Sequence, residues 1–182
     1  SHRAGRWAFN EYYASLLLEY GYQVDCSVTP RVNWRFSPGD PAGQGGSDYR
    51  HFPDAAYFID PHNIARAGNS TLLEVPMSIQ YKHSGLMNSI KQGYDALRGK
   101  QHSPSVHWLR PSGGNLATMK SVVERTLAAG SDYVEFMLHS SEFMPGGSPT
   151  FKNQEEIEGL YRDLDALFSW LSERTRGMTL AE

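Results

Sequence analysis

The chain has 182 residues but only one cysteine, Cys26, and its formal charge is only −3. A single thiol forms no disulfide within the chain, which is compatible with a reducing compartment, and we expect a cytoplasmic location. The weakly acidic balance provides no positive field for phosphate groups, so the sequence does not indicate nucleic-acid binding. No run of about 18 apolar residues is present, so no segment is predicted to span a membrane.

The composition and the order of patterns indicate a globular α/β protein. Hydrophobic residues make up 40% and aromatic residues 12% of the chain, which is enough for a packed core. Strand and helix patterns alternate, so we predict one domain over residues 1–182, a distorted or partial (β/α) barrel with parallel strands. The predicted helices cover residues 9–20, 84–99, 115–129 and 154–174, and the predicted strands cover 22–29, 72–79, 107–110 and 133–139. Residues 36–47 are predicted to form a loop, and residues 48–60 are too irregular to assign.

The segment from Tyr133 to Pro149 carries the strongest functional pattern. An alternating, mostly apolar run ends at His139 and continues into a loop of serine, glycine and proline. Barrel enzymes place catalytic groups at the carboxyl ends of their strands, and histidine side chains can exchange a proton near neutral pH. We therefore take His139 as the first candidate for chemistry, the alternative being a histidine that only caps the strand.

Two arginines close to the start of the sequence form a second pattern. Arg3 and Arg6 flank Gly5 and precede Trp7. A guanidinium group offers a rigid fork of donors, so these arginines suit a carboxylate held close to the backbone. Taken alone, they are equally well explained as surface arginines.

Taken together, these motifs resemble those of the polysaccharide deacetylases with a NodB-type barrel. The resemblance is to the branch associated with gene clusters for O-antigen and other surface polysaccharides. It covers nearly the whole chain and depends on the order of the motifs. They are Arg3-Ala-Gly-Arg-Trp7, Val24-Asp-Cys-Ser-Val-Thr-Pro30, Val32-Asn-Trp34, Leu72-Leu-Glu-Val-Pro76, Leu109-Arg-Pro-Ser-Gly-Gly114 and Leu138-His139-Ser-Ser.

The resemblance implies a hydrolase that removes an N-acetyl group from a sugar of a surface polysaccharide or its precursor. It implies an N-acetylated saccharide as substrate and a divalent metal as cofactor, with zinc as the expected ion. His139 would stabilise the oxyanion and protonate the leaving amine, and Arg3 would hold an aspartate that acts as the base. Leu138 would contact the acetyl methyl group, while Trp34 and Glu142 are candidates for substrate binding. Trp34 is otherwise a core residue and Glu142 a residue that faces water.

Two departures from the family pattern affect the metal and Arg3. The family carries an aspartate pair and a His-x-x-x-His segment before the arginine motif, whereas no two of the seven histidines here are four residues apart. We therefore expect the metal ligands in an N-terminal portion that precedes this sequence. Asn33 stands where the family often has an aspartate that orients the motif arginine. Asp25 is then the alternative partner of Arg3, although it could also be an exposed strand residue.

Two other functional classes stay open at the level of sequence. The first is a non-catalytic barrel that binds carbohydrate and derives from such an enzyme. The second is a glycoside hydrolase, which needs two carboxylates across a cleft, and the pair we would nominate is Glu74 and Glu142. Glu74 could instead be a solvated or capping carboxylate. Metal dependence would separate the deacetylase from both alternatives.

Overall fold

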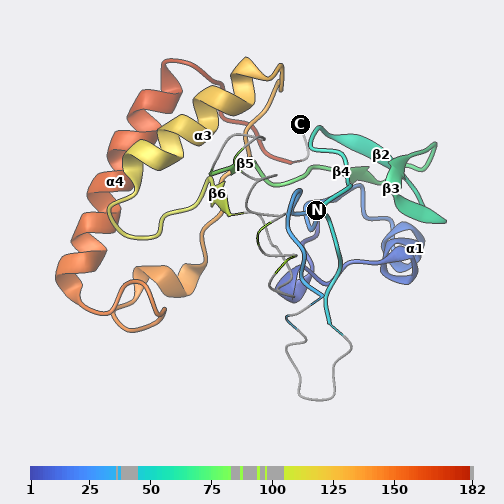
Figure 1. Cartoon of the computed structure of the whole chain (residues 1–182), viewed down its shortest axis with the longest axis horizontal. Helices are drawn as coiled ribbons and strands as arrows, with labels where there is room; N and C mark the ends of the chain where they lie inside the picture. Colours follow the sequence, from blue (N-terminus) through green and yellow to red (C-terminus); the bar gives the residue numbers. More distant parts are fainter. Residues whose placement is uncertain are drawn as a thin grey trace. The chain divides into compact units, whose positions relative to one another are not determined.

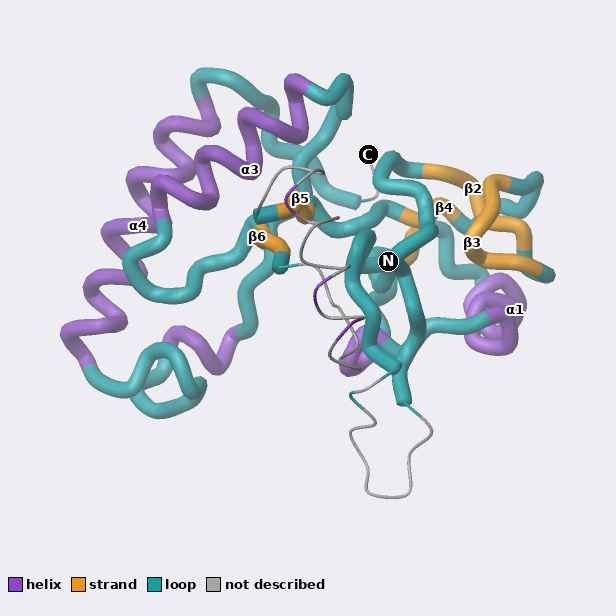
Figure 2. The backbone as a smooth tube through the Cα atoms, viewed as in Figure 1, coloured by secondary structure: helices purple, strands orange, loops and turns teal. Residues whose placement is uncertain are grey.

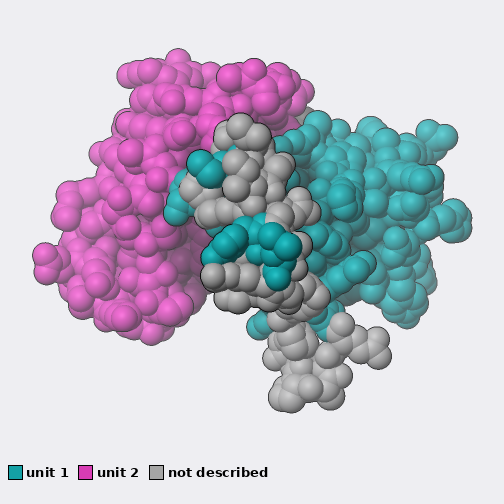
Figure 3. All heavy atoms as spheres, in the orientation of Figure 1, with its two compact units in different colours: residues 1–107, 181 teal, residues 108–180, 182 magenta. Residues whose placement is uncertain are grey.

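The computed structural model describes residues 1–35, 37, 45–82, 87, 94, 97 and 105–180 (Figure 1). The chain divides into two compact units, with the boundary between His107 and Trp108 (Figure 3). Most of the helix predicted over 84–99 and part of the loop predicted over 36–47 lie outside the described residues. The single deacetylase-like domain stays a prediction.

The first unit contains a mixed four-stranded sheet. Its strands are β1 (Val24–Asp25), β2 (Tyr57–Asp60), β3 (Asn63–Ala67) and β4 (Leu73–Glu74), in the order β1-β4-β2-β3 (Figure 2). Strands β1 and β4 are parallel, whereas β2 is antiparallel to both β4 and β3. The predicted α/β class with a parallel strand pair is therefore confirmed. The strands that the structure describes close no barrel.

The β2–β3 hairpin is an element that the sequence pattern did not reveal. Side chains along β2 alternate, with Tyr57 and Ile59 buried and Phe58 exposed. A bulge interrupts the register between Ile59 and Asp60, which conceals the regular two-residue period. Gly68 closes the hairpin by donating its N–H to the carbonyl of Phe58 (2.8 Å). A Cβ at Gly68 would lie 2.7 Å from Cα of Asp60, so a larger residue does not fit there.

Helix α1 (Glu11–Glu19) packs on this sheet and confirms the helix predicted over 9–20. It begins where Oδ1 of Asn10 accepts the N–H of Tyr13 (2.8 Å), and it ends before Gly21, whose φ of 72° suits a helix terminator. The buried side chains of α1 are Ala14 and Leu17. They belong to the same core as residues of the sheet and its connections, which include Val28, Tyr57, Ile59, Ile64 and Leu72.

The second unit is built on two helices, α3 (Leu116–Ala128) and α4 (Gln154–Ser172), close to the predicted ranges. The core between them contains Leu109, Met119, Val122, Val123, Leu167 and Leu171. A second cluster lies along the first half of α4 and contains Phe151, Ile157, Leu160 and Leu164. The amphipathic spacing of both helices thus matches the face that each buries.

The segment 133–139 is a correction, because no strand forms there. One backbone bond, from the N–H of Met137 to the carbonyl of Leu109 (3.2 Å), joins it to a neighbouring extended segment. The alternation of apolar and polar residues in this segment instead reflects packing, since Val134, Phe136 and Leu138 lie against the helical cores. The neighbouring predicted strand, 107–110, appears as β6 (Val106–Trp108), which pairs with β5 (Ile79–Tyr81).

An ion pair supports the segment that follows the glycine-rich loop of the first unit. Asp48 accepts two hydrogen bonds from the Arg50 guanidinium, at 2.9 and 2.7 Å, and forms an isolated bridge with Asn33. The hydrogen bond from Arg50 holds the pKa of the Asp48 carboxyl below its ordinary value. The charged form of Asp48 is therefore favoured in the folded state.

We predict that Asp48→Asn lowers the free energy of unfolding by about 1 kcal/mol at pH 7. A depressed pKa contributes stability above the unfolded-state pKa, near 4, and this contribution disappears as the pH falls through the lower folded-state pKa. Urea unfolding at several pH values should therefore show the difference shrink progressively as the pH falls below about 4. The exposed Asp132→Asn serves as the control, and a difference independent of pH would contradict the prediction.

Candidate functional site

The candidate residues occur in two groups, one in each unit. We call His2, Asp25, Ser27 and Glu74 the Asp25 cluster, which lies in the first unit with Arg3 and Trp34. Arg110, Leu138, His139 and Glu142 form the His139 cluster of the second unit. Each cluster is described by itself.

The Asp25 cluster is built at the carboxyl ends of two parallel strands. Asp25 ends β1, Glu74 ends β4, and the two residues are register partners. Both are fully buried, with 0% of their surface exposed. Asp25 Oδ1 lies 2.6 Å from Nδ1 of His2. The strand ends of parallel sheets are where α/β proteins place functional groups.

Hydrogen bonds from the chain itself hold both carboxylates. Ser27 donates to Asp25 twice, from its hydroxyl to Oδ1 (2.9 Å) and from its backbone N–H to Oδ2 (3.0 Å). Glu74 Oε1 accepts the N–H of Val28 (2.9 Å), and the Ser27 hydroxyl accepts the N–H of Ala4 (2.7 Å). Two alternatives are therefore wrong: Asp25 is not an exposed strand residue, and Glu74 is not solvated.

The arginine motif forms a short, strained turn, η1 (Gly5–Trp7). The guanidinium carbon of Arg3 lies 5.4 Å from the ring centroid of Trp7, a cation–π contact. Arg6 and Trp7 adopt φ values of 56° and 60°, which side-chain-bearing residues rarely do. Such strain costs about 1–3 kcal/mol for each residue and persists only where neighbouring contacts impose it.

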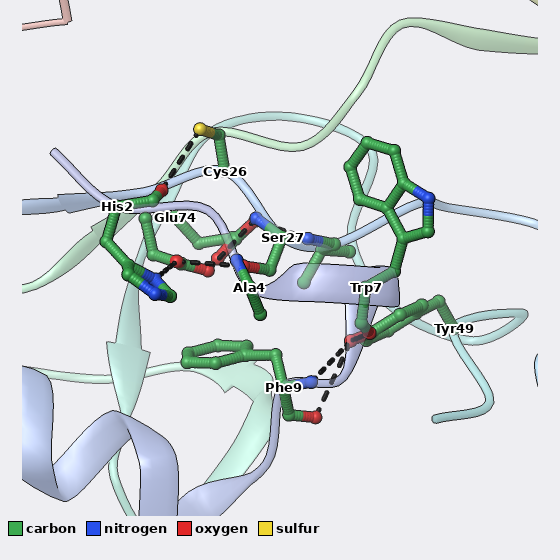
Figure 4. Close-up of polar contacts among 10 residues, drawn as sticks. His2, Ala4, Trp7, Phe9, Cys26, Ser27, Tyr49 and Glu74 are labelled. Carbon is green, nitrogen blue, oxygen red and sulfur yellow. Dashed lines mark hydrogen bonds and ion pairs between the residues drawn. The ribbon is translucent and has the colours of Figure 1, made fainter. Parts of the chain in front are cut away.

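The Tyr49 hydroxyl bonds the backbone at the end of this turn. This buried hydroxyl donates to the carbonyl of Trp7 (2.6 Å) and accepts the N–H of Phe9 (3.2 Å), as Figure 4 shows. Burial strongly raises the pKa of the Tyr49 phenol, so the hydroxyl keeps its proton and its role as a donor. The arginine motif is thus fixed by a residue more than 40 positions further along the chain.

We predict that Tyr49→Phe lowers the free energy of unfolding by about 1–3 kcal/mol, because the Trp7 carbonyl and the Phe9 N–H lose a buried partner while the ring stays in place. Chemical denaturation measures the change. The exposed Tyr12→Phe, on α1, should leave the stability unchanged. If Tyr49→Phe left the free energy of unfolding unchanged, contacts other than the Tyr49 hydroxyl would hold the strained turn.

The two other candidates of the first unit have structural contacts. Trp34 donates its indole N–H to the Thr29 hydroxyl (2.8 Å) and packs against the core of the first unit, as the core alternative expected. Oδ1 of Asn33 accepts the N–H of Arg35 (3.0 Å) and so closes a local turn. A contact of Trp34 with substrate stays a prediction.

The His139 cluster is organised by a buried carboxylate. Only 1% of Glu142 is exposed. Its Oε1 accepts a hydrogen bond from the Arg110 guanidinium (2.9 Å), and its Oε2 accepts the N–H of His139 (2.8 Å). The alternative that Glu142 merely faces water is therefore wrong. Its proposed contact with substrate stays a prediction, although both carboxylate oxygens already accept hydrogen bonds from the protein.

The same carboxylate fixes the start of a short 3-10 helix, η2 (Ser140–Phe143). The N–H of Glu142 bonds the carbonyl of His139 (3.0 Å), so the two backbone polar groups of His139 both bond to Glu142. The imidazole itself is exposed. The structure thus presents a solvent-facing histidine ring on a firmly held backbone.

Leu138 and Arg110 complete the cluster. Leu138 is half-buried and packs against the core that contains Phe151 and Leu160, while its contact with an acetyl group stays a prediction. Arg110 has no role predicted from the sequence, although it is the last residue of the strand predicted over 107–110. An arginine at a strand end is a weak signal, because nothing in the sequence links it to Glu142, 32 positions away.

The described residues do not fit a metal site. Within that part of the chain, no three histidine, cysteine, aspartate or glutamate side chains come together in a group that could hold a metal ion. In the Asp25 cluster, both Asp25 oxygens and Oε1 of Glu74 already accept hydrogen bonds from the protein. The divalent metal stays a prediction from the resemblance.

Comparisons with known proteins give no information on the function of this chain. No family model, no curated protein and no solved structure matches it. In the part of the chain that the structure describes, we find no helix with the length and apolar character needed to cross a bilayer. We therefore infer function from the contacts of the two clusters and from the motif resemblance.

We predict that Glu142→Gln lowers the free energy of unfolding by about 2 kcal/mol, because it removes the ion pair with Arg110 and disturbs the bond to the His139 N–H. Urea denaturation gives the first value, and faster hydrogen exchange at the His139 amide should accompany it. The exposed Glu155→Gln on α4 is the matched control. Unchanged exchange at His139 would show that Glu142 does not anchor this residue.

Proposed function

We propose that this protein is a hydrolase that removes an N-acetyl group from a sugar of a surface polysaccharide or its precursor. The observation that carries the proposal is the exposed His139 ring on a backbone held by the buried Glu142. We also propose that the mixed sheet is part of a distorted or partial (β/α) barrel, as the motif resemblance implies.

The anchoring of His139 suits proton transfer. A general acid must lie within hydrogen-bond reach of the leaving group, and its position must not drift during the reaction. Glu142 restrains both the N–H and the carbonyl of His139, so the side chain has only its own torsions to adjust. An exposed ring can at the same time meet a substrate that arrives from solution.

Amide hydrolysis defines what His139 would do. The oxygen of a water molecule bonds to the acetyl carbon, and the carbonyl oxygen gains negative charge. The bond between carbon and nitrogen then breaks, with the electron pair going to nitrogen. Protonated His139 stabilises the oxyanion and gives its proton to the nitrogen, so that acetate and a sugar amine leave.

Arg3 is proposed to hold a carboxylate that takes the proton from the water. Its guanidinium lies over Trp7, in a turn that Tyr49 keeps in a strained conformation. Strained segments of this kind gather at functional sites, where the position of one side chain matters more than local stability. A divalent metal, when bound, would supply Lewis-acid chemistry at the acetyl carbonyl, and the described residues of this chain form no group that would hold it.

The glycoside hydrolase alternative finds less support. Its two carboxylates must face a substrate and must exchange protons or attack a sugar carbon. Glu74 and Glu142 are instead buried, and each accepts hydrogen bonds from its own chain. Neither carboxylate is placed to meet a sugar.

We predict that His139→Ala lowers kcat for acetate release from an N-acetylated saccharide by about 10²-fold or more. The measurement uses the protein with a divalent metal added. His62→Ala removes another exposed histidine, in the β2–β3 turn, and should leave the rate unchanged. Thermal unfolding of both variants should resemble that of the wild type, because neither ring is buried.

Three results would be informative. Acetate release by His139→Ala at the wild-type rate would overturn the catalytic role of this residue. No release by the wild-type protein, together with saccharide binding, would favour the non-catalytic carbohydrate-binding alternative. Release that stops on chelation and returns with added metal would support the metal-dependent reaction.

A further inference from the structure

Two aromatic rings lie stacked on the surface of the second unit. The ring centroids of Phe143, in η2, and Tyr161, in α4, are 5.6 Å apart, and the ring planes differ by 28°. Phe143 is 39% exposed and Tyr161 49% exposed. We call this pair the aromatic platform. Rings that are stacked on each other and still reach water form an ordered flat surface that could receive a ligand.

The platform lies close to the proposed general acid along the chain. Phe143 is the last residue of η2, the helix that begins directly after His139. Glu142 immediately precedes Phe143 and is the buried residue that bonds both Arg110 and the His139 N–H. The contacts that hold the backbone at His139 therefore also hold the backbone that carries one of the two rings.

Polar groups lie around the platform. On α4, Glu158 and Asp165 are exposed one turn before and one turn after Tyr161, and residues at these spacings share one side of a helix. Ser140 and Ser141 of η2 are exposed as well. These carboxylates and hydroxyls can bond the hydroxyl groups of a ligand whose apolar face lies on the rings.

The size of the apolar surface limits what can bind there. Phe143, its neighbour Met144, Tyr161 and Phe168, two turns further along α4, are exposed large apolar residues. They offer on the order of a few hundred Å², whereas a stable protein partner covers about 800 Å² on each side. A pyranose ring fits better, because one of its faces carries C–H groups and its edge carries hydroxyls.

We propose that the aromatic platform is a saccharide-binding subsite that stacks on a sugar ring next to the one being deacetylated. The substrate would then be a chain of N-acetylated sugars and not a free monosaccharide. This inference rests on the proposed function, because it names the substrate class of the same reaction. Tyr161 would act on binding and would take no part in the chemistry.

The test compares substrates of two lengths, N-acetylglucosamine and a soluble oligomer of it. For each protein we take the ratio of kcat/KM on the oligomer to kcat/KM on the monosaccharide. In Tyr161→Ala this ratio should fall about three- to tenfold, the effect of losing one aromatic contact. Tyr161→Phe keeps the ring and should restore most of the ratio, whereas the exposed Tyr12→Ala in the first unit should not change it.

Binding of the oligomer to the His139→Ala protein, measured by calorimetry, separates the two proposals. Weaker binding on adding Tyr161→Ala supports the platform, even if the wild-type protein releases no acetate and the proposed function fails. Acetate release by the wild type with an unchanged ratio in Tyr161→Ala overturns the platform alone. Concentration-dependent dimerisation that Tyr161→Ala abolishes, without oligomer binding, also overturns it and assigns the rings to a contact between copies.

Discussion

A buried carboxylate must find hydrogen bonds inside the protein, and three nearly inaccessible ones shape both units of this chain. Isolated charges in the interior are costly, so Asp25, Glu74 and Glu142 each draw backbone N–H groups toward themselves. In doing so they fix the chain after β1 and at the start of η2. The segments that carry the functional candidates are therefore positioned by polar contacts as much as by apolar packing.

The buried carboxylates of the two units have different partners. In the first, carboxylates at the ends of two parallel strands receive N–H groups from the segment that follows β1, and Tyr49 holds the arginine turn. In the second, one carboxylate joins a guanidinium, a histidine N–H and a short helix. His139, the proposed proton donor, and Phe143, a ring of the proposed aromatic platform, then lie within a few residues of the same anchor.

Much of the helical structure could be predicted from the sequence, because it depends on local spacing. The amphipathic stripes and glycine stops place α1, α3 and α4 within a few residues of the predicted ranges. The hairpin of β2 and β3 escaped prediction because a bulge breaks its period, and 133–139 imitated a strand because its alternating side chains pack on helices.

The candidate site was predicted only in part, for a related reason. His139 could be nominated because its position after an apolar run is a local pattern, and its catalytic role stays a prediction. The burial of Glu142 could not, since a glutamate within a serine-rich loop looks solvated and its partner Arg110 is 32 residues away. The pairing of Asp25 with Glu74 likewise depends on the sheet register, which no local pattern encodes.

The central claim is that the protein hydrolyses the amide of an N-acetylated sugar. Mass spectrometry of an N-acetylglucosamine oligomer incubated with the full-length protein and a divalent metal tests it most directly. Deacetylation would appear as loss of acetyl groups, with free amine and acetate formed in equal amounts and the sugar chain intact. Shortened sugar chains that keep all their acetyl groups would contradict the claim.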